Sequence, residues 1–300
     1  MCPLASSSAL FLPWRVTVLD VIQRSTDFLS RKGVESPRLQ VELLLAHVLQ
    51  MPRMKLYLNF DRALSEPELE TLRSLIKRRA EREPLQHIVG STSFCGFEFT
   101  VNRDVMVPRP ETELLAEQAW SFLATLTASP AIVLDFGTGS GCLAIVIALK
   151  SPTTTVHTVD ISEAALAVAR ANAQRHGMGE KIHFHLGDGF KGVDPVIAFD
   201  LIVSNPPYIP SAEIATLEPE VRDFDPRLAL DGGADGLEFY RLLAAQGRAH
   251  LKPAGKLMLE FGEGQHGEIS ALFTNAGWTV ETVVKDYSGR ERILIARPGD

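Results

Sequence analysis

Residues 134–148 read LDFGTGSGCLAIVIA, and they join an apolar strand to an apolar helix through a turn with three glycines. The glycines are Gly137, Gly139 and Gly141. Glycine adopts positive φ without strain and lets a ligand approach the backbone closely. In an open α/β sheet, ligands bind outside the carboxyl ends of the strands. The stretch therefore predicts a strand–turn–helix unit with a binding site at the turn; the alternative is a turn that serves only helix–strand packing.

The alternation of strands and helices continues toward the end of the chain. Further strands are predicted at residues 154–160, 181–186, 199–204, 256–261, 278–285 and 291–297. Helical segments separate these strands, except between the last two, and this alternation indicates a mostly parallel, doubly wound sheet. The last two strands should form a hairpin, which makes one edge of the sheet antiparallel. We therefore expect an α/β fold with a Rossmann-like sheet.

Residues 14–88 have a different pattern, which predicts a small all-α domain of three to five helices. One apolar stripe at helical spacing includes Val18 and Ile22, and another includes Val41 and Leu45. Residues 91–102, STSFCGFEFTVN, then alternate as a two-stranded ribbon does. The stretch VPRPETE (107–113) leads from the ribbon into the next helix.

The net charge of −7 is unevenly distributed over the 300 residues. Residues 1–90 contain 13 Lys and Arg against 10 Asp and Glu, a balance of +3, and the remainder has a balance of −10. Binding to a duplex depends on neutralising phosphates, so we expect no stable nucleic-acid complex. No apolar run approaches the roughly 20 residues of a membrane span, and Arg15 is the first basic residue. We therefore expect neither a membrane segment nor a secretory signal.

Three cysteines are present: Cys2, Cys95 and Cys142. Their odd number and their spacing fit no disulfide or metal pattern, and neither CxxC nor HExxH occurs. We therefore expect a reducing, cytoplasmic location and no metal site. Cys142, at the start of the helix after the glycines, is interpreted as a small buried residue rather than a reactive thiol.

The glycine spacing and two acidic residues narrow the class of ligand. The spacing is GxGxG rather than the GxGxxG that packs a dinucleotide pyrophosphate, and no Walker lysine follows. Asp160 ends the second strand, where a carboxylate can bind both hydroxyls of a ribose. Asp188 and Gly189 follow the third strand. These features favour an adenosine-containing sulfonium cofactor, S-adenosylmethionine, with S-adenosylhomocysteine as its product.

The fourth strand of this series ends in SNPPYIP (204–210), where two prolines have no N–H to continue a sheet. The residue before a proline is held extended, so Asn205 and Pro206 are both extended. The Asn205 side-chain oxygen and the Pro206 carbonyl then form a rigid pair of acceptors for a planar –NH2 group, and Tyr208 would lie against a flat π surface. Alternatively, the motif is only a rigid turn.

Such a pair would promote methyl transfer to a poor nucleophile. The lone pair of a carboxamide or of adenine N6 is delocalised, and two acceptors would fix the N–H bonds so that the lone pair points toward the methyl donor. They would also stabilise the positive charge that develops on nitrogen. A general base is not required, because the N-protonated amide that methyl transfer produces is acidic enough to lose its proton to water or a carbonyl.

Residues 15–297 together resemble the PrmC/HemK family, the glutamine-N5 methyltransferases that act on peptide-chain release factors. The motifs that carry the resemblance are VPRPETE (107–113), DFGTGSG (135–141), VDIS (159–162), SNPPYIP (204–210), DPRLALDGGADGLEFY (225–240), LEFGEGQ (259–265) and KDYSGRERILIA (285–296). This resemblance implies a class I S-adenosylmethionine methyltransferase sheet. Together with the patterns above, it leads us to expect four parts: a loose extension (1–13), a helical substrate-recognition domain (14–88), a β-ribbon linker (89–110) and the methyltransferase domain (111–300).

The resemblance also assigns site residues. The resemblance implies that the cofactor contacts Gly137, Thr138, Gly139, Ser140, Gly141, Asp160 and Asn205. We add Asp188 and Gly189 because they follow the third strand. Those expected to hold the glutamine of a Gly-Gly-Gln loop are Asn205, Pro206, Pro207 and Tyr208, and we assign the catalytic role to Asn205, Pro206 and Tyr208. The helical domain is expected to contact the release factor.

This chain departs from the family pattern at three places. Phe136 stands where leucine is usual, and Asp225-Pro226 replaces Glu-Pro. Gly189 stands where relatives often have a large residue beside the adenine, so we expect the Gly189 backbone and Phe190 to line that part of the pocket.

Two clusters of charged residues lie on predicted helices. Glu111 and Glu113 follow Arg109 in the first turn of a helix, where acids complement the helix dipole and where the resemblance places them at the border of the site. The basic residues Arg73, Lys77, Arg78, Arg79 and Arg82 are expected to form a solvated helical face. The alternative for this face is a contact with an acidic release-factor surface or with ribosomal RNA.

Four functions remain open from the sequence, and release-factor glutamine methylation by a monomer is preferred. A ribosomal-protein glutamine methyltransferase shares nearly every motif. An adenine-N6 methyltransferase must take its base from the stack and needs a basic cleft, which the balance of −10 disfavours. A non-catalytic or dinucleotide-binding protein, such as an oxidoreductase, is opposed by GxGxG and NPPY.

Overall fold

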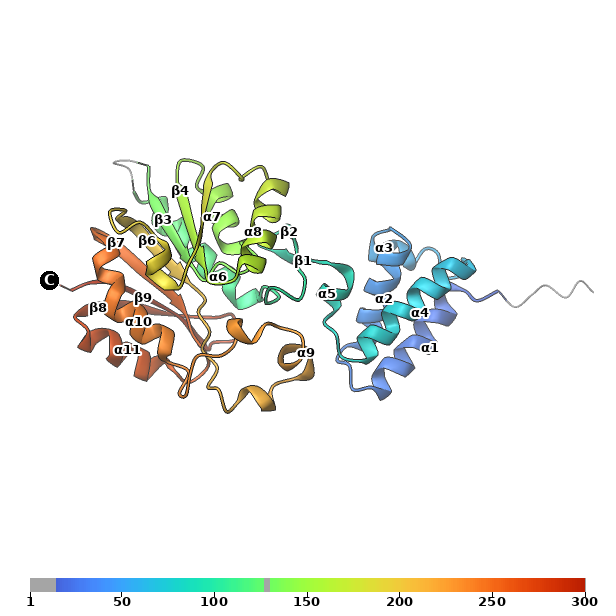
Figure 1. The fold of residues 1–300 in the computed structure, drawn as a ribbon. Coiled ribbons are helices and arrows are strands. Elements are labelled where there is room, and N and C mark those ends of the chain that lie inside the picture. The colour runs from blue at the N-terminus through green and yellow to red at the C-terminus, as the bar shows by residue number, and fades with distance from the viewer. Residues whose placement is uncertain (1–14, 127–129, 300) are drawn as a thin grey trace, which may run out of the picture. The chain divides into compact units, whose positions relative to one another are not determined.

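The structure is a computed structural model that describes residues 15–126 and 130–299 (Figure 1). The extension predicted for residues 1–13 therefore lies outside the described residues. The chain divides between Val89 and Gly90 into two compact units, which are described separately.

The first unit is helical over residues 15–89, as the sequence predicts. Its helices are α1 (Val18–Arg31), α2 (Pro37–Val48), α3 (Arg53–Leu56), α4 (Glu66–Ala80) and α5 (Leu85–Val89). Capping boxes start the two longest helices, with Thr17 and Asp20 at α1 and with Ser65 and Glu68 at α4. Each box satisfies backbone N–H groups that the start of a helix leaves without partners. Apolar residues from α1, α2 and α4 form the core of the unit.

The basic face predicted on α4 is solvated only in part: Arg73 and Lys77 are exposed as predicted. Arg79 is buried, and its Nε donates to the Gln40 side-chain oxygen of α2 at 2.7 Å. Arg78 forms two hydrogen bonds with Glu83, each at 2.8 Å. The prediction is wrong for Arg79, because Gln40 engages its guanidinium group in the interior of the unit.

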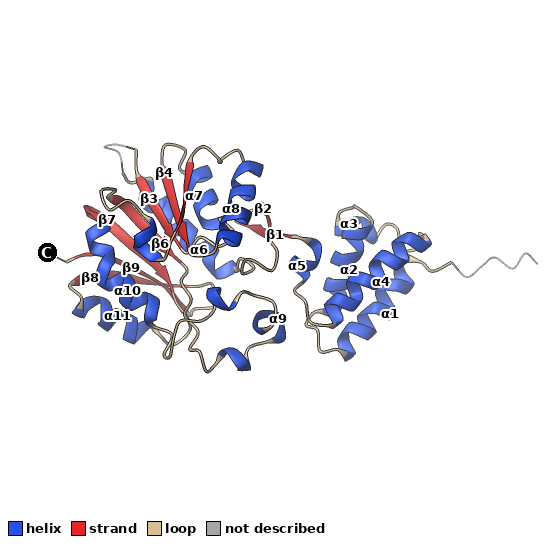
Figure 2. Cartoon of the chain, viewed as in Figure 1, coloured by secondary structure: helices blue, strands red, loops and turns tan. Residues whose placement is uncertain are grey.

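The second unit contains a seven-stranded sheet (Figure 2). Its strands are β3 (Ile132–Phe136), β4 (Thr155–Asp160), β5 (Ile182–Leu186), β6 (Phe199–Ser204), β7 (Leu251–Glu260), β8 (Trp278–Lys285) and β9 (Glu291–Pro298). The strand order is β5-β4-β3-β6-β7-β9-β8, parallel from β5 to β7 and antiparallel at β9 and β8. The predicted parallel sheet with an antiparallel C-terminal hairpin is confirmed.

Helices cover both faces of this sheet because successive strand residues point to opposite sides. Val133 packs in the core with α6 (Pro110–Leu123), α7 (Cys142–Lys150) and α8 (Glu163–Arg175). Leu134 packs in the core with α10 (Glu238–Gln246) and α11 (His266–Asn275). The strand order reverses between β3 and β6, and such a reversal places a binding crevice at the carboxyl ends of the strands.

A short ribbon, β1 (Ser91–Phe94) and β2 (Phe97–Thr100), belongs to the second unit. The Asn172 side chain of α8 accepts from the Thr100 N–H at 2.8 Å and donates to the Thr100 carbonyl at 3.0 Å. Its Nδ2 also donates to the Ser140 carbonyl of the glycine turn at 2.9 Å. Asn172 thus ties the ribbon, α8 and the turn together.

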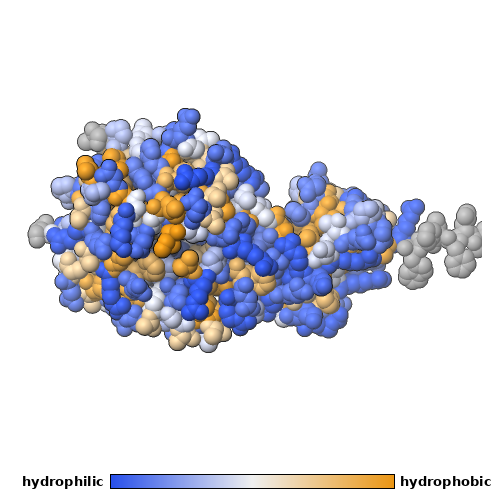
Figure 3. Space-filling model, in the orientation of Figure 1, coloured by the Kyte–Doolittle hydropathy of each residue, from blue (hydrophilic) through white to orange (hydrophobic). Residues whose placement is uncertain are grey.

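The segment between β6 and α10 crosses the carboxyl end of the sheet, and it contains the short helix α9 (Pro219–Arg222). Ile209 and Asp231 pair in an isolated parallel bridge that closes this segment on itself. The visible surface of the molecule is mainly hydrophilic, with hydrophobic side chains in small groups (Figure 3). None of the helices in the described ranges is long and apolar enough to cross a membrane.

Candidate active site

A pocket lies at the carboxyl ends of β3, β4 and β6, where the fold predicts one. The predicted site residues in its lining are Gly137, Thr138, Gly139, Ser140, Asp160, Asp188, Gly189, Asn205 and Pro207. Two loop segments, which we call the crossing segments, also contribute to the lining, at residues 104–108 and 226–229. Gly141, Pro206 and Tyr208 lie next to this lining but are not part of it.

The glycine turn leaves room for a ligand at two of its three glycines. Gly137 and Gly139 have φ of +77° and +54°, and a Cβ on either one would meet no atom within 4 Å. Gly141 has φ of +78°, but a Cβ there would lie 3.0 Å from the Ala169 Cβ of α8. Gly141 is therefore required for the packing of α7 against α8. The alternative that the glycines serve only packing holds for Gly141, but not for Gly137 or Gly139.

Asp160 at the end of β4 holds the turn while it faces the pocket. One carboxylate oxygen accepts from the Gly139 N–H at 2.9 Å, and the other accepts from the Ser162 N–H at 2.9 Å. Since an ionised carboxylate has about four acceptor positions, Asp160 retains capacity for further donors such as hydroxyl groups.

Asp135 is a pocket residue that the sequence analysis missed. It lies in β3 and is buried, and its carboxylate accepts from the Thr138 hydroxyl at 2.6 Å. Burial raises the pKa of Asp135 to about 7, although the bond from Thr138 opposes this shift. An acid inside the apolar run IVLDF was the available signal, because a buried acid requires a specific partner.

Two departures from the family pattern are packed against each other. Gly189 has φ of +62°, and a Cβ there would lie 3.3 Å from the Phe136 Cζ. The Phe136 ring also contacts Phe190, with ring centroids 5.0 Å apart. The large Phe136 side chain on β3 thus occupies space beside Gly189, where relatives often have a large side chain. Asp188 is exposed and pairs with Lys191 at 2.7 Å.

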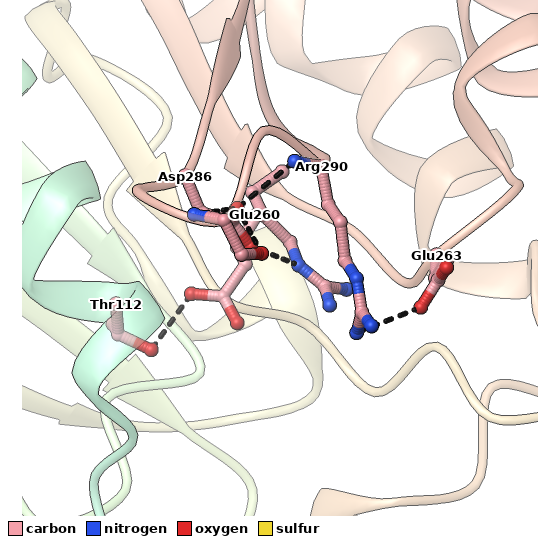
Figure 4. A network of polar contacts seen from close by, with 7 residues as sticks. Thr112, Glu260, Glu263, Asp286 and Arg290 are labelled. Atoms are coloured by element: carbon pink, nitrogen blue, oxygen red, sulfur yellow. Dashed lines mark hydrogen bonds and ion pairs between the residues drawn. The ribbon is translucent and has the colours of Figure 1, made fainter.

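Asn205 is oriented by two residues that the sequence analysis did not select. Its Nδ2 donates to the Thr112 hydroxyl at 3.0 Å, and that hydroxyl donates to the Glu260 carboxylate at 2.7 Å. The Asn205 side chain also hydrogen-bonds to Glu260. Figure 4 shows Thr112 projecting from α6 toward the Glu260 carboxylate. Both residues occur in quoted motifs, VPRPETE and LEFGEGQ.

Glu260 is fixed at the end of β7 in a low-dielectric environment. It is buried, and burial raises its pKa to about 7, whereas the Thr112 hydrogen bond lowers it. The Tyr240 hydroxyl donates to the Glu260 backbone carbonyl at 2.8 Å. Arg292 of β9 attracts the carboxylate, but its Nε already donates to Asp286 at 3.2 Å.

The remaining residues of NPPY form the wall beside Asn205. Pro206 is buried, and Pro207 lines the pocket. Tyr208 accepts from the Gln265 side chain through its backbone carbonyl at 2.9 Å, and its burial raises its pKa to about 12. Within residues 15–126 and 130–299, no protein donor bonds to the Asn205 Oδ1 or to the Pro206 carbonyl oxygen.

An ion pair connects the two segments that cross the pocket. Arg109 contacts the buried carboxylate of Asp225 at 2.7 Å, and the Val107 N–H points to the same carboxylate at 3.4 Å. Burial raises the pKa of Asp225 to about 6, against the attraction of Arg109. Glu113 lies in the first turn of α6 as predicted, but its carboxylate accepts the Cys95 N–H of the ribbon at 2.7 Å.

Cys142 is buried, as expected, and burial raises the pKa of its thiol to about 12. Across the two described ranges, no group of three or more His, Cys, Asp or Glu side chains has an arrangement that could hold a metal ion.

Two family models match parts of the chain. The PrmC N-terminal domain matches residues 20–90, within and just beyond the helical unit. The methyltransferase small domain matches residues 117–218, which include the glycine turn and NPPY.

Known relatives extend over nearly the whole length. A release factor glutamine methyltransferase from Geobacter sulfurreducens is 42% identical over 285 residues, which are 94% of this chain and 97% of the relative. One from Rhodospirillum rubrum is 44% identical over 265 residues, covering 88% of this chain and 80% of the relative.

Among solved structures, a methyltransferase from Pyrococcus furiosus has the same fold, with a TM-score of 0.52 and 22% identity, over 75% of this chain and 99% of that one. With this sheet, this pocket and near-full-length relatives at 42% and 44% identity, the chain belongs to the release factor glutamine methyltransferase family.

Proposed function

We propose that this enzyme methylates the side-chain amide nitrogen (N5) of the glutamine in the Gly-Gly-Gln motif of peptide-chain release factors, with S-adenosylmethionine as the donor. The observation that carries the proposal is the orientation of Asn205 at the rim of the glycine-turn pocket. Its Nδ2 is engaged by Thr112 at 3.0 Å, so its oxygen remains for a substrate donor. The names of the relatives supply the substrate class.

The residues of the pocket fit the proposed cofactor. Open space above Gly137 and Gly139 allows a ligand to contact the backbone. Asp160 would accept from ribose hydroxyls, and Gly189 with Phe136 would form the wall beside the adenine. When bound, S-adenosylmethionine supplies an electrophilic methyl group on a sulfonium.

The enzyme's own groups then act on the amide nitrogen. The Asn205 Oδ1 and the Pro206 carbonyl oxygen each accept one N–H of the substrate –NH2 group. This fixes the plane of the amide and directs the nitrogen lone pair out of it. Holding two reactants in line can contribute roughly 7–11 kcal/mol to lowering a barrier. Tyr208 would support the flat face of the amide. The positively charged N-methylated amide then releases its proton to water, without a general base.

The helical unit is proposed to recognise the release factor, and the cytoplasmic location and monomeric state remain predictions from the sequence. A glutamine of a release factor and a glutamine of a ribosomal protein would be methylated by the same chemistry. Adenine N6 also presents a planar –NH2 group, but an acidic methyltransferase unit is poorly suited to a phosphate backbone.

The test is incubation of the enzyme with methyl-labelled S-adenosylmethionine and, separately, a release factor, a ribosomal protein and duplex DNA. Label should appear on the release factor, and replacement of its Gly-Gly-Gln glutamine by alanine should abolish labelling. Label on the ribosomal protein or on DNA, with none on the release factor, would overturn the proposal and select one of the alternatives.

A further inference from the structure

The two ends of the Asn205 amide are similar in shape but opposite in hydrogen bonding. The oxygen accepts, whereas the nitrogen donates two hydrogens. The proposed substrate also presents a donor –NH2 group. If the Asn205 amide were rotated by half a turn, two donors would face each other and the substrate would be repelled. The orientation of this amide therefore decides whether the site functions.

The contacts of Thr112 determine this orientation. Its hydroxyl has a single hydrogen, and that hydrogen is donated to the Glu260 carboxylate at 2.7 Å. The hydroxyl can then only accept from Asn205, so the atom that faces it at 3.0 Å must be Nδ2. An ionised carboxylate cannot donate. The direction of the whole chain of hydrogen bonds thus starts at Glu260.

We infer that Glu260, acting through Thr112, orients the Asn205 amide so that its oxygen faces the substrate. Glu260 and Thr112 are then positioning residues, and Asn205 is the catalytic residue that they serve. This inference rests on the proposed function, because only an amino-group substrate requires an acceptor at this place. The N–H bonds that Asn205 gives to acceptors also polarise its amide and strengthen the oxygen as an acceptor.

Protonation of Glu260 would remove this control. A protonated carboxyl can donate to Thr112, whose hydrogen is then free to turn toward Asn205, and the opposite amide orientation becomes allowed. The groups that face or neighbour Glu260 are Thr112 and Glu111 of α6, Asn205, Tyr208, Tyr240 of α10 and Arg292 of β9. Glu111 raises the pKa of Glu260, and Arg292 lowers it.

The resulting pH dependence has a definite sign. Because burial raises the pKa of Glu260 to about 7, the ionised form and the correct amide orientation should be favoured above that value. The turnover number should therefore decrease as the pH falls through neutrality. Neither the substrate amide nor the Asn205 amide titrates in this range. Asp135 in the pocket also has a pKa of about 7, so the part of the loss that disappears in Glu260→Gln is the part that belongs to Glu260.

The kinetic test compares isosteric variants. Thr112→Val should lower kcat by about 100-fold, the loss that a misplaced group can cause, with little change in the Kd for the cofactor. Thr112→Ser, which retains the hydroxyl, should restore most of the rate. Glu260→Gln should lower kcat and flatten its pH profile around neutrality. Thr158→Val is the matched control, because Thr158 of β4 is buried as Thr112 of α6 is, but its hydroxyl has no hydrogen-bond partner among residues 15–126 and 130–299.

A second readout is independent of turnover. The Asn205 side-chain NH2 resonance, assigned by its loss in Asn205→Asp, should shift with pH near neutrality in the wild type and not in Glu260→Gln. An unshifted resonance, or a Thr112→Val enzyme as fast as the wild type with the same pH profile, would overturn the inference. A wild-type enzyme that transfers no methyl to a release factor would instead overturn the proposed function, and the resonance would still test the orientation of Asn205.

Discussion

The glycine turn and the NPPY segment form two sides of one pocket, but they are held in different ways. The turn is fixed by nearby residues: Asp160 bonds to the Gly139 N–H, and Asp135 bonds to the Thr138 hydroxyl only three positions away. Asn205 depends on Thr112, which precedes it by 93 positions. One side is thus built from backbone that side chains 3, 21 and 32 positions away hold in place, and the other is built from side chains of more distant elements.

This difference separates binding from chemistry. A local turn with positive φ creates a space of fixed shape, which is sufficient to bind a cofactor. Methyl transfer also requires an acceptor with a defined direction, and hydrogen bonds from rigid elements supply that direction. Substitutions on the two sides should therefore affect different measured quantities.

Of the substitutions predicted below, Asn205→Ala should cause the largest effect, and this effect should be mainly on kcat. Loss of one preorganised polar group at a transition state costs about 10²–10³ in kcat. The fold should remain, because Asn205 supports neither the turn nor Asp160. The cofactor affinity should fall less than in Asp160→Ala, because Asn205 is one of several residues that line the pocket. Single-turnover labelling and calorimetry would measure the two quantities, with the exposed Asn275→Ala as a control. Near-normal turnover would refute the acceptor-pair mechanism.

Asp160→Ala should show the reverse pattern. Hydrogen bonds to a charged group contribute about 1.5–3 kcal/mol, so the Kd for S-adenosylmethionine should increase by a corresponding factor. The rate at saturating cofactor should change less than it does for Asn205→Ala. Asp160→Asn, which keeps an acceptor for Gly139 or Ser162, should lie between the alanine variant and the wild type. Unchanged affinity by calorimetry would contradict the ribose role.

The same distinction explains what the sequence could predict. The strands, their alternation with helices and the C-terminal hairpin follow from local apolar patterns, and all were confirmed in the sheet. The turn was recognisable because its three glycines lie within five consecutive residues. It was not apparent that Gly141 serves packing against Ala169, because that contact depends on how α7 lies against α8.

Residues whose partners are distant in sequence could not be assigned. Glu260 appeared as one acid in an apolar strand, and its link to Thr112 spans 148 positions. Arg79 appeared to belong to a solvated face, whereas Gln40 of α2 engages it in the interior. A buried polar group requires a partner, but which partner it has depends on the packing of the elements, and sequence spacing does not give that packing.

Asp225→Asn tests the ion pair that joins the crossing segments. The pKa of Asp225 is raised from 3.8 to about 6 by burial, so the folded state binds its proton more tightly than the unfolded state does. The contribution of Asp225 to the unfolding free energy should thus fall as the pH rises between these values, on the order of 2–3 kcal/mol. The asparagine variant stays neutral and should lack this decrease.

Urea unfolding of both proteins at a series of pH values would measure the difference. Glu260 and Asp135 also have raised pKa values, but they are present in both proteins and cancel in the comparison. A difference that is constant with pH would mean that Asp225 titrates normally and that Arg109 fully compensates its burial.

Gly189→Ala tests the turn after β5, which lines the pocket beside the glycine turn, and it should have the smallest effect. A residue with a side chain in the left-handed region costs about 1–2 kcal/mol, and the new Cβ would also approach the Phe136 ring at 3.3 Å. Phe136→Leu in the same chain should relieve the contact but not the backbone strain, so part of the loss should persist. Gly267→Ala, at an open helical position without positive φ, should not destabilise the protein. Equal unfolding free energies for Gly189→Ala and Gly267→Ala would show that Gly189 is replaceable and that the turn after β5 is not constrained by its backbone.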